Sequence, residues 1–198
     1  MKKLKIFAKG ETINLCQPTK EFAGGDIWYK WLNNPVINKQ LERKYRNSKN
    51  TRKKQIKFFV NLKKNKRKVF IISTKDHVYK GVVSLSKIDN VKKICDISLI
   101  TDTKIDPLLS PYAGLEAIAL MSDFAFFKLK LKKIYGGGYF VLKNWQQRME
   151  LIGFKLDHLR ENNEINSYTT LKKPSYLISL SYDDYMRLKK KGVWFGIT

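Results

Sequence analysis

One stretch of eighteen residues, SPYAGLEAIALMSDFAFF (residues 110–127), contains no lysine or arginine. Elsewhere these cations occur at about every fifth position, with 40 of them in a chain of 198 residues. Because buried helices exclude charged side chains, the stretch predicts a buried helix over residues 114–130. A helix of this kind is typical of a crossover between two parallel strands, so the sheet is expected to contain a parallel pair.

Alternating apolar and polar residues predict three successive strands before this helix, at residues 68–74, 79–88 and 93–100. Short turns between them predict an antiparallel meander. The other expected elements are a strand near 12–17, a helix capped by Asp26, a helix over 51–64, a strand at 132–141, a short helix from Asn144 to Gly153, and strands near 154–160 and 168–182. The order β-α-α-β-β-β-α-β-α-β-β predicts an α/β fold with a mixed sheet and helices on both faces. Residues 1–198 are expected to form one domain.

The start of the helix without cations is a candidate anion site. The first N–H groups of a helix have no internal partner, and the helix dipole places partial positive charge beside them. Ser110 can cap the helix and Pro111 has no N–H, so the free donors are expected at Tyr112, Ala113, Gly114 and Leu115. Because Gly114 has no Cβ, a phosphate oxygen could approach the backbone closely there. A plain capped helix is the alternative interpretation.

The formal net charge is +23, and lysine outnumbers arginine by 33 to 7. Lysines recur along nearly the whole chain, with denser patches at residues 43–54, 63–68, 128–133 and 187–191. Two interpretations stay open: a coat of lysines on a solvated surface, or a basic groove for an anionic ligand. Arginine is the better partner for phosphate, so its scarcity counts against a dedicated nucleic-acid protein.

Composition and spacing disfavour several classes of protein. The longest apolar run, residues 115–127, contains two acidic residues and is shorter than the roughly 20 residues that span a bilayer, so no membrane insertion is expected. The opening residues lack the apolar stretch of a secretory signal. Cys16 and Cys95 lie in strand-like surroundings, which favours buried thiols and a cytoplasmic location. Neither the cysteines nor His77 and His158 have metal-ligand spacing, so no metal is expected.

The order of elements and four local strings resemble the GNAT superfamily of acyl-CoA-dependent N-acetyltransferases. They are most similar to its branch of ribosomal-protein alanine acetyltransferases and bacterial amino-sugar N-acetyltransferases. The strings resemble the first helix, the fourth strand, a helix-to-strand junction and the closing strand of that branch, and they are WYKWLNNP (28–35), KICDISLI (93–100), ELIGFKLD (150–157) and SYLISLSYDDY (175–185). The resemblance covers most of residues 11–186 and implies a GNAT-like fold that uses acetyl-CoA.

The resemblance also implies where acetyl-CoA would bind. The family's pyrophosphate loop, Gln/Arg-x-x-Gly-x-Gly/Ala, falls on residues 109–114, where only Gly114 is kept. The glycine run at 136–138 is expected beside splayed strands that admit the pantetheine arm. A cofactor-binding asparagine of the family lies about two residues before Asn144, for which helix capping is the alternative. The family's oxyanion donors are strand backbone, which here implies Leu99, Ile100 and Thr101.

Acyl transfer to an amine needs a base that takes the amine's proton. The resemblance implies Asp96 as the first candidate, because it aligns with an acidic position of the family's fourth strand; an exposed carboxylate beside Lys92 and Lys93 is the alternative. Glu116 is the second candidate, and in the first turn of a helix a glutamate could simply complement the dipole. Many relatives use a tyrosine as general acid at the position of Met149. A thiol of pKa about 8.5 can leave as thiolate without that acid.

Acceptor contacts in this branch come from the first two helices and their loop, which implies Trp28, Trp31, Asn34 and Tyr45; core packing and helix capping are the alternatives. The acceptor is expected to be a small-molecule amine, with an anionic nucleotide-linked amino sugar as the first choice, because its diphosphate suits the surplus of lysines. A ribosomal-protein N-terminus is the second choice. A non-catalytic RNA- or ribosome-binding module on the same scaffold is the alternative from another class.

Overall fold

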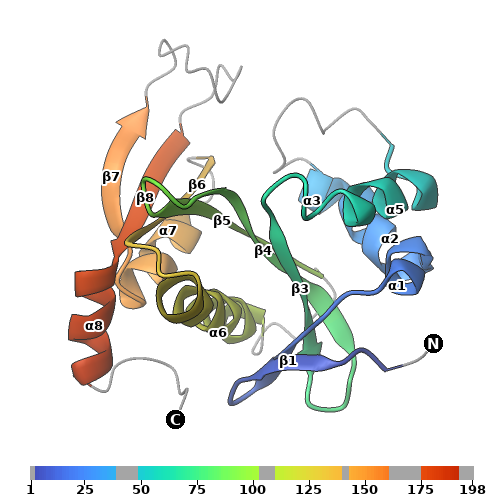
Figure 1. Ribbon diagram of the computed structural model, residues 1–198, viewed down its shortest axis with the longest axis horizontal. Helices are drawn as coiled ribbons and strands as arrows, with labels where there is room; N and C mark the ends of the chain where they lie inside the picture. The colour runs from blue at the N-terminus through green and yellow to red at the C-terminus, as the bar shows by residue number, and fades with distance from the viewer. Residues whose placement is uncertain (1–2, 39–48, 103–109, 140–142, 161–174, 192–198) are drawn as a thin grey trace.

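The computed structural model describes residues 3–38, 49–102, 110–139, 143–160 and 175–191. Its centre is one eight-stranded sheet of order β1-β2-β3-β4-β5-β6-β8-β7 (Figure 1). The strands are β1 Ile6–Lys9, β2 Ile13–Cys16, β3 Lys68–Thr74, β4 Tyr79–Asp89, β5 Ile94–Thr101, β6 Lys133–Tyr139, β7 Lys155–Arg160 and β8 Ser175–Ser181. Neighbours are antiparallel except β5 and β6, which are parallel. The predicted mixed sheet, its meander β3-β4-β5 and its parallel pair are therefore confirmed.

Helices pack on both faces of the sheet, as predicted. The first core lies between one face of the sheet and four helical elements. These are α6 (Ser110–Asp123), its continuation as a π-helical turn η1 (Phe124–Lys128), α7 (Lys143–Leu151) and α8 (Tyr182–Lys190). The helices on the opposite face are α1 (Lys20–Gly24), α2 (Asp26–Asn33), α3 (Pro35–Asn38) and α5 (Arg52–Val60). Figure 1 shows α6 in front of the middle of the sheet, and the second group of helices at the right.

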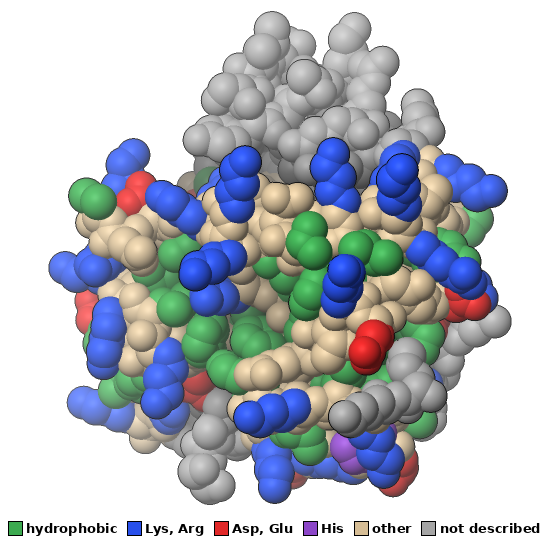
Figure 2. Space-filling view, turned by 45° about the vertical axis from the view of Figure 1, so that its right-hand side comes forward, with side chains coloured by type: hydrophobic (Ala, Val, Ile, Leu, Met, Phe, Trp, Pro, Cys, Tyr) green, Lys and Arg blue, Asp and Glu red, His purple; other side chains and the backbone are tan. Residues whose placement is uncertain are grey.

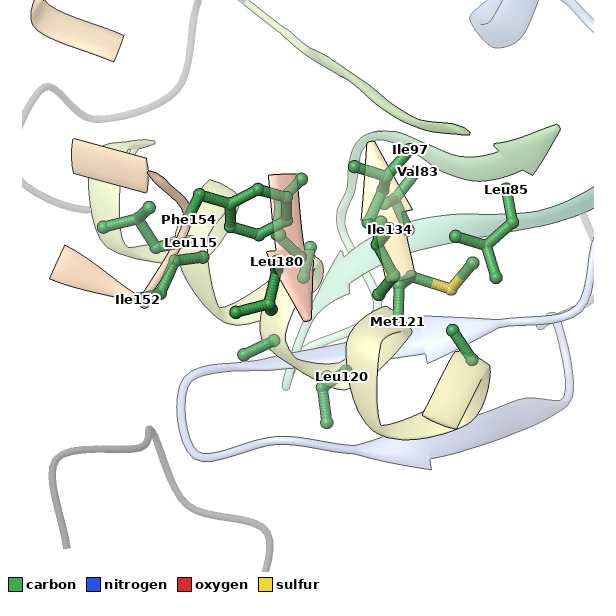
Figure 3. Close-up of a cluster of buried hydrophobic side chains, with 14 of the residues drawn as sticks. Val83, Leu85, Ile97, Leu115, Leu120, Met121, Ile134, Ile152, Phe154 and Leu180 are labelled. Atoms are coloured by element: carbon green, nitrogen blue, oxygen red, sulfur yellow. The ribbon is translucent and has the colours of Figure 1, made fainter. Parts of the chain in front are cut away.

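Helix α6 crosses from β5 to β6, and every side chain from Ala113 through Asp123 is buried. Leu115, Leu120 and Met121 lie among strand side chains that point to the same face, including Val83, Leu85, Ile97, Ile134 and Leu180 (Figure 3). Burying a leucine or methionine side chain stabilises the fold by about 1.5–3 kcal/mol, whereas a buried lysine would need a partner for its charge. Burial therefore accounts for the missing cations, and the prediction is confirmed.

The second core lies on the opposite face of β3 and β4. Val69 and Ile71 of β3 belong to it, while Phe70 between them belongs to the first core. This alternation is the two-residue period of a strand with both faces covered. Helices α1 and α2 fill this core with Phe22, Trp28 and Trp31.

Several elements differ from the prediction. Strand β1 was not expected; Phe7 of this edge strand stacks on Phe70 with ring centroids 4.1 Å apart. Helix α2 has Gly25 rather than Asp26 at its N-cap position. The closing strand ends at Ser181 because the Ser181 hydroxyl accepts a hydrogen bond from the Asp184 N–H at 3.1 Å and so starts α8. The N-cap at Ser181 therefore sets the end of the strand, although the sequence pattern predicted a strand as far as residue 182.

Among the described residues, four lysines have a positive φ, the left-handed conformation that favours glycine: Lys66, Lys87, Lys93 and Lys130. Lys130 follows η1 with φ 55°, and the next N–H, of Leu131, donates to the Ala125 carbonyl at 3.0 Å. A side chain in this conformation costs about 1–2 kcal/mol, which glycine avoids.

We therefore expect Lys130→Gly to raise the free energy of unfolding by about 0.5–1 kcal/mol, because relief at φ 55° outweighs the entropy that glycine loses on folding. Denaturant unfolding measures the change. Lys128→Gly, inside η1, is the matched control and should destabilise by about 1 kcal/mol. Equal destabilisation by both would contradict this account of Lys130.

Candidate functional site

Strands β5 and β6 pair at one end and then separate. Residues 94–96 of β5 pair with residues 133–135 of β6, yet β5 continues to Thr101 and β6 to Tyr139. The outer edges stay paired, β5 with β4 as far as Thr101 and β6 with β8 as far as Tyr139. Within the described residues, the facing edges of residues 97–101 and 136–139 have no strand partner. The sheet therefore contains the expected wedge, and its β5 wall includes the backbone of Leu99, Ile100 and Thr101.

The β6 wall of the wedge begins with glycines. A Cβ on Gly136 would lie 3.5 Å from side-chain carbons of Ile97 and of Ile178, so this position faces the first core between β5 and β8. A Cβ on Gly137 would lie 2.8 Å from the Tyr176 carbonyl oxygen, so glycine allows β8 to approach closely. The glycine run thus lies where it was expected, beside the splayed strands.

The prediction of free N–H groups at residues 112–115 is mostly wrong. Helix α6 begins at Ser110, so the N–H groups of Gly114 and Leu115 reach the carbonyls of residues 110 and 111 within the helix. Of the four predicted donors, Tyr112 remains in the first turn, and its side chain is exposed. Ala113 is buried. The donors of the first turn thus lie earlier in the chain than the sequence indicated.

Gly114 has a packing role in the structure, and its expected contact with phosphate stays a prediction. A Cβ there would lie 3.0 Å from Leu99 and 3.2 Å from the ring of Trp145. The glycine therefore lets β5 and α7 close onto α6 beside the wedge. Trp145 of α7 lies half-buried against the first core at this point.

Helix α7 adds two further results. Met149 and Ile152 are buried, so the position of the family's tyrosine holds a core methionine. Asn144 is the second residue of α7 and is exposed, which leaves its role in cofactor binding a prediction. Any proton for the leaving thiolate must therefore come from elsewhere than residue 149.

Asp96 is the last residue of β5 before the wedge opens. Cys95 and Ile97 on either side of it are buried in the first core, so Asp96 points to the opposite face. Its carboxylate pairs with Lys87 Nζ at 2.6 Å, rather than with Lys92 or Lys93, and its side chain is 36% exposed. Burial raises the pKa of the Cys95 thiol to about 12, so that thiol stays protonated. Asp96 is thus the accessible acidic side chain at the neck of the wedge.

A strip of small polar side chains continues from Asp96 along the same face. Ser86 lies opposite Asp96 in the β4–β5 ladder, and Ser84 lies opposite Ser98 with their hydroxyl oxygens 2.8 Å apart. Ser84 and Ser86 are buried, whereas Ser98 is exposed. Sequence reasoning missed this strip, although polar residues two apart in each of two neighbouring strands were the available signal.

Glu116 was expected in the first turn of its helix but lies in the second. Its side chain is buried, with the residue 3% exposed. Its carboxylate accepts hydrogen bonds from the N–H groups of Glu11, Thr12 and Ile13, at 3.1 Å for Thr12 and 3.2 Å for Ile13, and from the Thr12 hydroxyl. Gly10 lies against the same carboxylate and has no room for a Cβ. Glu116 therefore ties the turn between β1 and β2 to α6, a structural role that its position in sequence concealed.

Two of the four expected acceptor residues are core residues. Trp28 is 2% exposed and packs against Phe22 and Phe58, so its expected contact with substrate is wrong. Trp31 is 5% exposed, and its Nε1–H donates to Asp102 Oδ2 at 3.3 Å, which ties α2 to the end of β5. Asn34 caps α2, and its Oδ1 accepts the Val36 N–H at 2.9 Å. Tyr45 lies outside the described residues.

The described residues contain no group of three or more His, Cys, Asp and Glu side chains placed to hold a metal ion. Among the described helices, none has the length and apolar character required to cross a membrane.

Comparison with known proteins identifies solved structures that share this fold. No family model matches the chain, and no curated protein matches its sequence. The crystal structure of spermidine N-acetyltransferase from Vibrio cholerae in complex with CoA and spermine matches with a TM-score of 0.71 and 14% identity, over 88% of this chain and 98% of that one. The microcin C7 self-immunity acetyltransferase MccE, in complex with acetyl-CoA and AMP, matches with a TM-score of 0.67 and 18% identity, over 86% and 93%. The chain therefore has the fold of the GNAT N-acetyltransferases.

Proposed function

We propose that this protein is an N-acetyltransferase that transfers the acetyl group of acetyl-CoA to a primary amine. The wedge between β5 and β6 is the observation that carries the proposal. An unpaired strand edge inside a sheet offers N–H and C=O groups that need partners, and the amide groups of a pantetheine arm can supply them. When bound, acetyl-CoA would supply its acetyl group as a thioester.

The backbone of β5 would provide the electrostatic part of catalysis. N–H groups of Leu99, Ile100 or Thr101 that face the wedge can donate to a carbonyl oxygen as negative charge develops on it. The first turn of α6, which lies where β5 leads into the helix, favours the anionic phosphates through the helix dipole. We also propose that Asn144, exposed at the start of α7, contacts the cofactor.

Asp96 would act as the base. Its ion pair with Lys87 orients the carboxylate at the narrow end of the wedge, where it can accept a proton from the incoming amine through a water. The exposed Ser98 hydroxyl on the same strip can hydrogen-bond to the amine. As the nitrogen–carbon bond forms, the carbon–sulfur bond breaks, and the thiolate takes a proton from solvent because Met149 cannot supply one.

The charge of the protein favours an anionic acceptor. The chain carries a net charge of +23, and Figure 2 shows Lys and Arg side chains spread over the whole visible face with few acidic ones between them. A cationic polyamine would be repelled by this surface, whereas a nucleotide-linked amino sugar would be attracted. We therefore keep the amino sugar as the proposed acceptor, with a peptide N-terminus second.

Binding of coenzyme A is the first test. We expect acetyl-CoA at 100 times its dissociation constant to stabilise the fold by about 2.7 kcal/mol, which raises the melting temperature by about 5–10 °C. Thermal unfolding with acetyl-CoA, CoA and ATP at equal concentrations measures this. ATP is the control for non-specific attraction of an anion to a cationic protein. Stabilisation by ATP as large as that by acetyl-CoA would contradict a specific site.

Release of free thiol then tests transfer and the acceptor class. The assay compares spermidine, a nucleotide-linked amino sugar and a peptide with a free N-terminus at equal concentrations with acetyl-CoA. We expect the highest kcat/KM for the amino sugar. A preference for spermidine would overturn the anionic acceptor and leave the N-acetyltransferase intact, whereas no release with any amine would count against the enzyme itself.

A further inference from the structure

The positive charge is concentrated in one segment of the chain. Residues 43–75 carry 14 Lys and Arg and no Asp or Glu, so one sixth of the sequence holds +14 of the net charge of +23. The remaining sequence carries 26 cations and all 17 acids. A uniform coat of lysines would not produce this difference, so this segment requires its own explanation.

Five of the cations in this segment lie on helix α5 and the turn that follows it. We define the α5 surface as Lys53, Lys54, Lys57, Lys63 and Lys64, all exposed, on α5 and the turn that follows it. The inward side of α5 holds Gln55, Ile56 and Phe58, and the Phe58 ring contacts Trp28 of α2. Arg67 folds the turn back onto the helix, with its guanidinium carbon 5.4 Å from the centre of the Phe58 ring. In Figure 1, α5 lies at the outer side of the second group of helices.

These lysines have no acidic partners within the described residues. None of the ion pairs found there involves the α5 surface; the nearby Asp26 is paired with Arg52 and Lys30 instead. Lys54 Nζ donates to the Lys49 carbonyl at 2.9 Å, which leaves its charge uncompensated. The surface therefore presents five positive charges to a partner.

The same cations are placed where they weaken their own helix. The first turn of α5 contains Arg52, Lys53 and Lys54 and no acidic residue, so three cations lie beside the positive end of the helix dipole. Lys53 and Lys57, one turn apart, repel each other. A helix under selection for stability alone would carry acidic residues at this end, so binding of an anion is the better explanation.

We infer that the α5 surface binds the phosphate backbone of a nucleic acid. A nine-residue helix is about 13 Å long, enough to lie along several consecutive phosphates of one strand. Lysine acts as a point charge, so recognition is independent of sequence. An anionic membrane would require apolar anchors, and on α5 only Val60 is an exposed large apolar side chain. This inference does not depend on the acyl-transfer site, which lies at the wedge between β5 and β6.

Fluorescence anisotropy with a labelled 20-nucleotide single-stranded RNA, and with DNA of the same sequence, tests the inference over a range of salt concentrations. The test variant is Lys53→Glu/Lys57→Glu/Lys64→Glu. The control, Lys9→Glu/Lys132→Glu/Lys190→Glu, makes the same change in net charge at exposed lysines of β1, of the segment before β6 and of α8. We expect the test variant to bind at least about tenfold more weakly and its plot of log K against log salt to be shallower by about 2, since each contact with single strands contributes about 0.7. The control should bind within about threefold of the unmodified protein.

Two further measurements make the result decisive. The melting temperature of the test variant should be equal or higher, because the acids relieve the helix dipole; a weaker complex with intact folding then supports the surface. Its stabilisation by acetyl-CoA should be unchanged, which separates this inference from the proposed function. Equal weakening of test and control variants would overturn the inference, as would no binding to either nucleic acid at 50 mM salt. Tighter binding to phosphatidylserine vesicles than to RNA, lost in the test variant, would assign the surface to membranes instead.

Discussion

Replacing Glu116 with alanine is expected to lower the free energy of unfolding by about 3–5 kcal/mol. The variant removes a buried carboxylate that accepts hydrogen bonds from three backbone N–H groups and the Thr12 hydroxyl. The donors would then lose their partner, the buried Ile13 N–H most severely. Hydrogen bonds to charged groups contribute about 1.5–3 kcal/mol apiece, and water reaching the exposed Glu11 and Thr12 offsets part of the loss. Chemical denaturation followed by circular dichroism measures the loss.

Two variants separate this structural role from a catalytic one. Glu116→Gln keeps the shape of the side chain and one acceptor oxygen, so it should lose less than half as much stability. Glu11→Ala removes an exposed carboxylate nearby and should change stability by less than about 0.5 kcal/mol. If Glu116→Ala kept full stability and lost turnover, Glu116 would be part of the chemistry and our interpretation would be wrong.

Replacing Asp96 with asparagine is expected to lower kcat by about 100-fold, with little change in the binding of acetyl-CoA. Asparagine keeps the size of the side chain but cannot accept a proton, and general base catalysis contributes a factor of about 10²–10⁴. Steady-state thiol release with the best acceptor, measured over a range of acetyl-CoA concentrations, provides kcat and the KM for acetyl-CoA.

Lys87→Met is the matched control, because it removes the other half of the ion pair and leaves the carboxylate in place. We expect kcat to fall by less than about tenfold. The alternative, a surface ion pair without a catalytic role, requires both variants to leave kcat unchanged, since an exposed pair contributes about 0–1 kcal/mol to stability. A kcat of Asp96→Asn within twofold of the unmodified protein would therefore remove Asp96 from the mechanism.

Most of the sheet could be predicted because its signals are local. Alternation defined β3, β4 and β5, and the absence of cations marked α6 as buried, which in turn required a parallel crossover. The start of α6 was misplaced because Ser110 and Pro111 suit either the cap or the first turn, and the choice depends on the preceding chain. Strand β1 was not predicted because it is an edge strand of only four residues, too short for a clear alternation of apolar and polar side chains.

The candidate site was less predictable, because side-chain roles depend on contacts between distant residues. Glu116 is bonded to residues about 100 positions earlier, and no spacing rule connects them. Trp28 and Trp31 fit the sequence pattern of an acceptor helix, but tryptophan on an amphipathic helix fits a core equally well, and burial decides for the core. Asp96 could be identified through the family resemblance, whereas its partner Lys87 required the register of β4 against β5.

The narrow junction of β5 and β6 has a mechanical consequence. Only three residues of each strand pair where β5 meets β6, so the two parts of the sheet, β1–β5 and β6–β8, are joined by a short ladder. A molecule seated in the wedge with its own amides would complete the ladder. Binding of such a molecule should therefore make this part of the sheet more rigid. The unliganded protein should exchange the amide hydrogens of β6 for deuterium faster than those of β3.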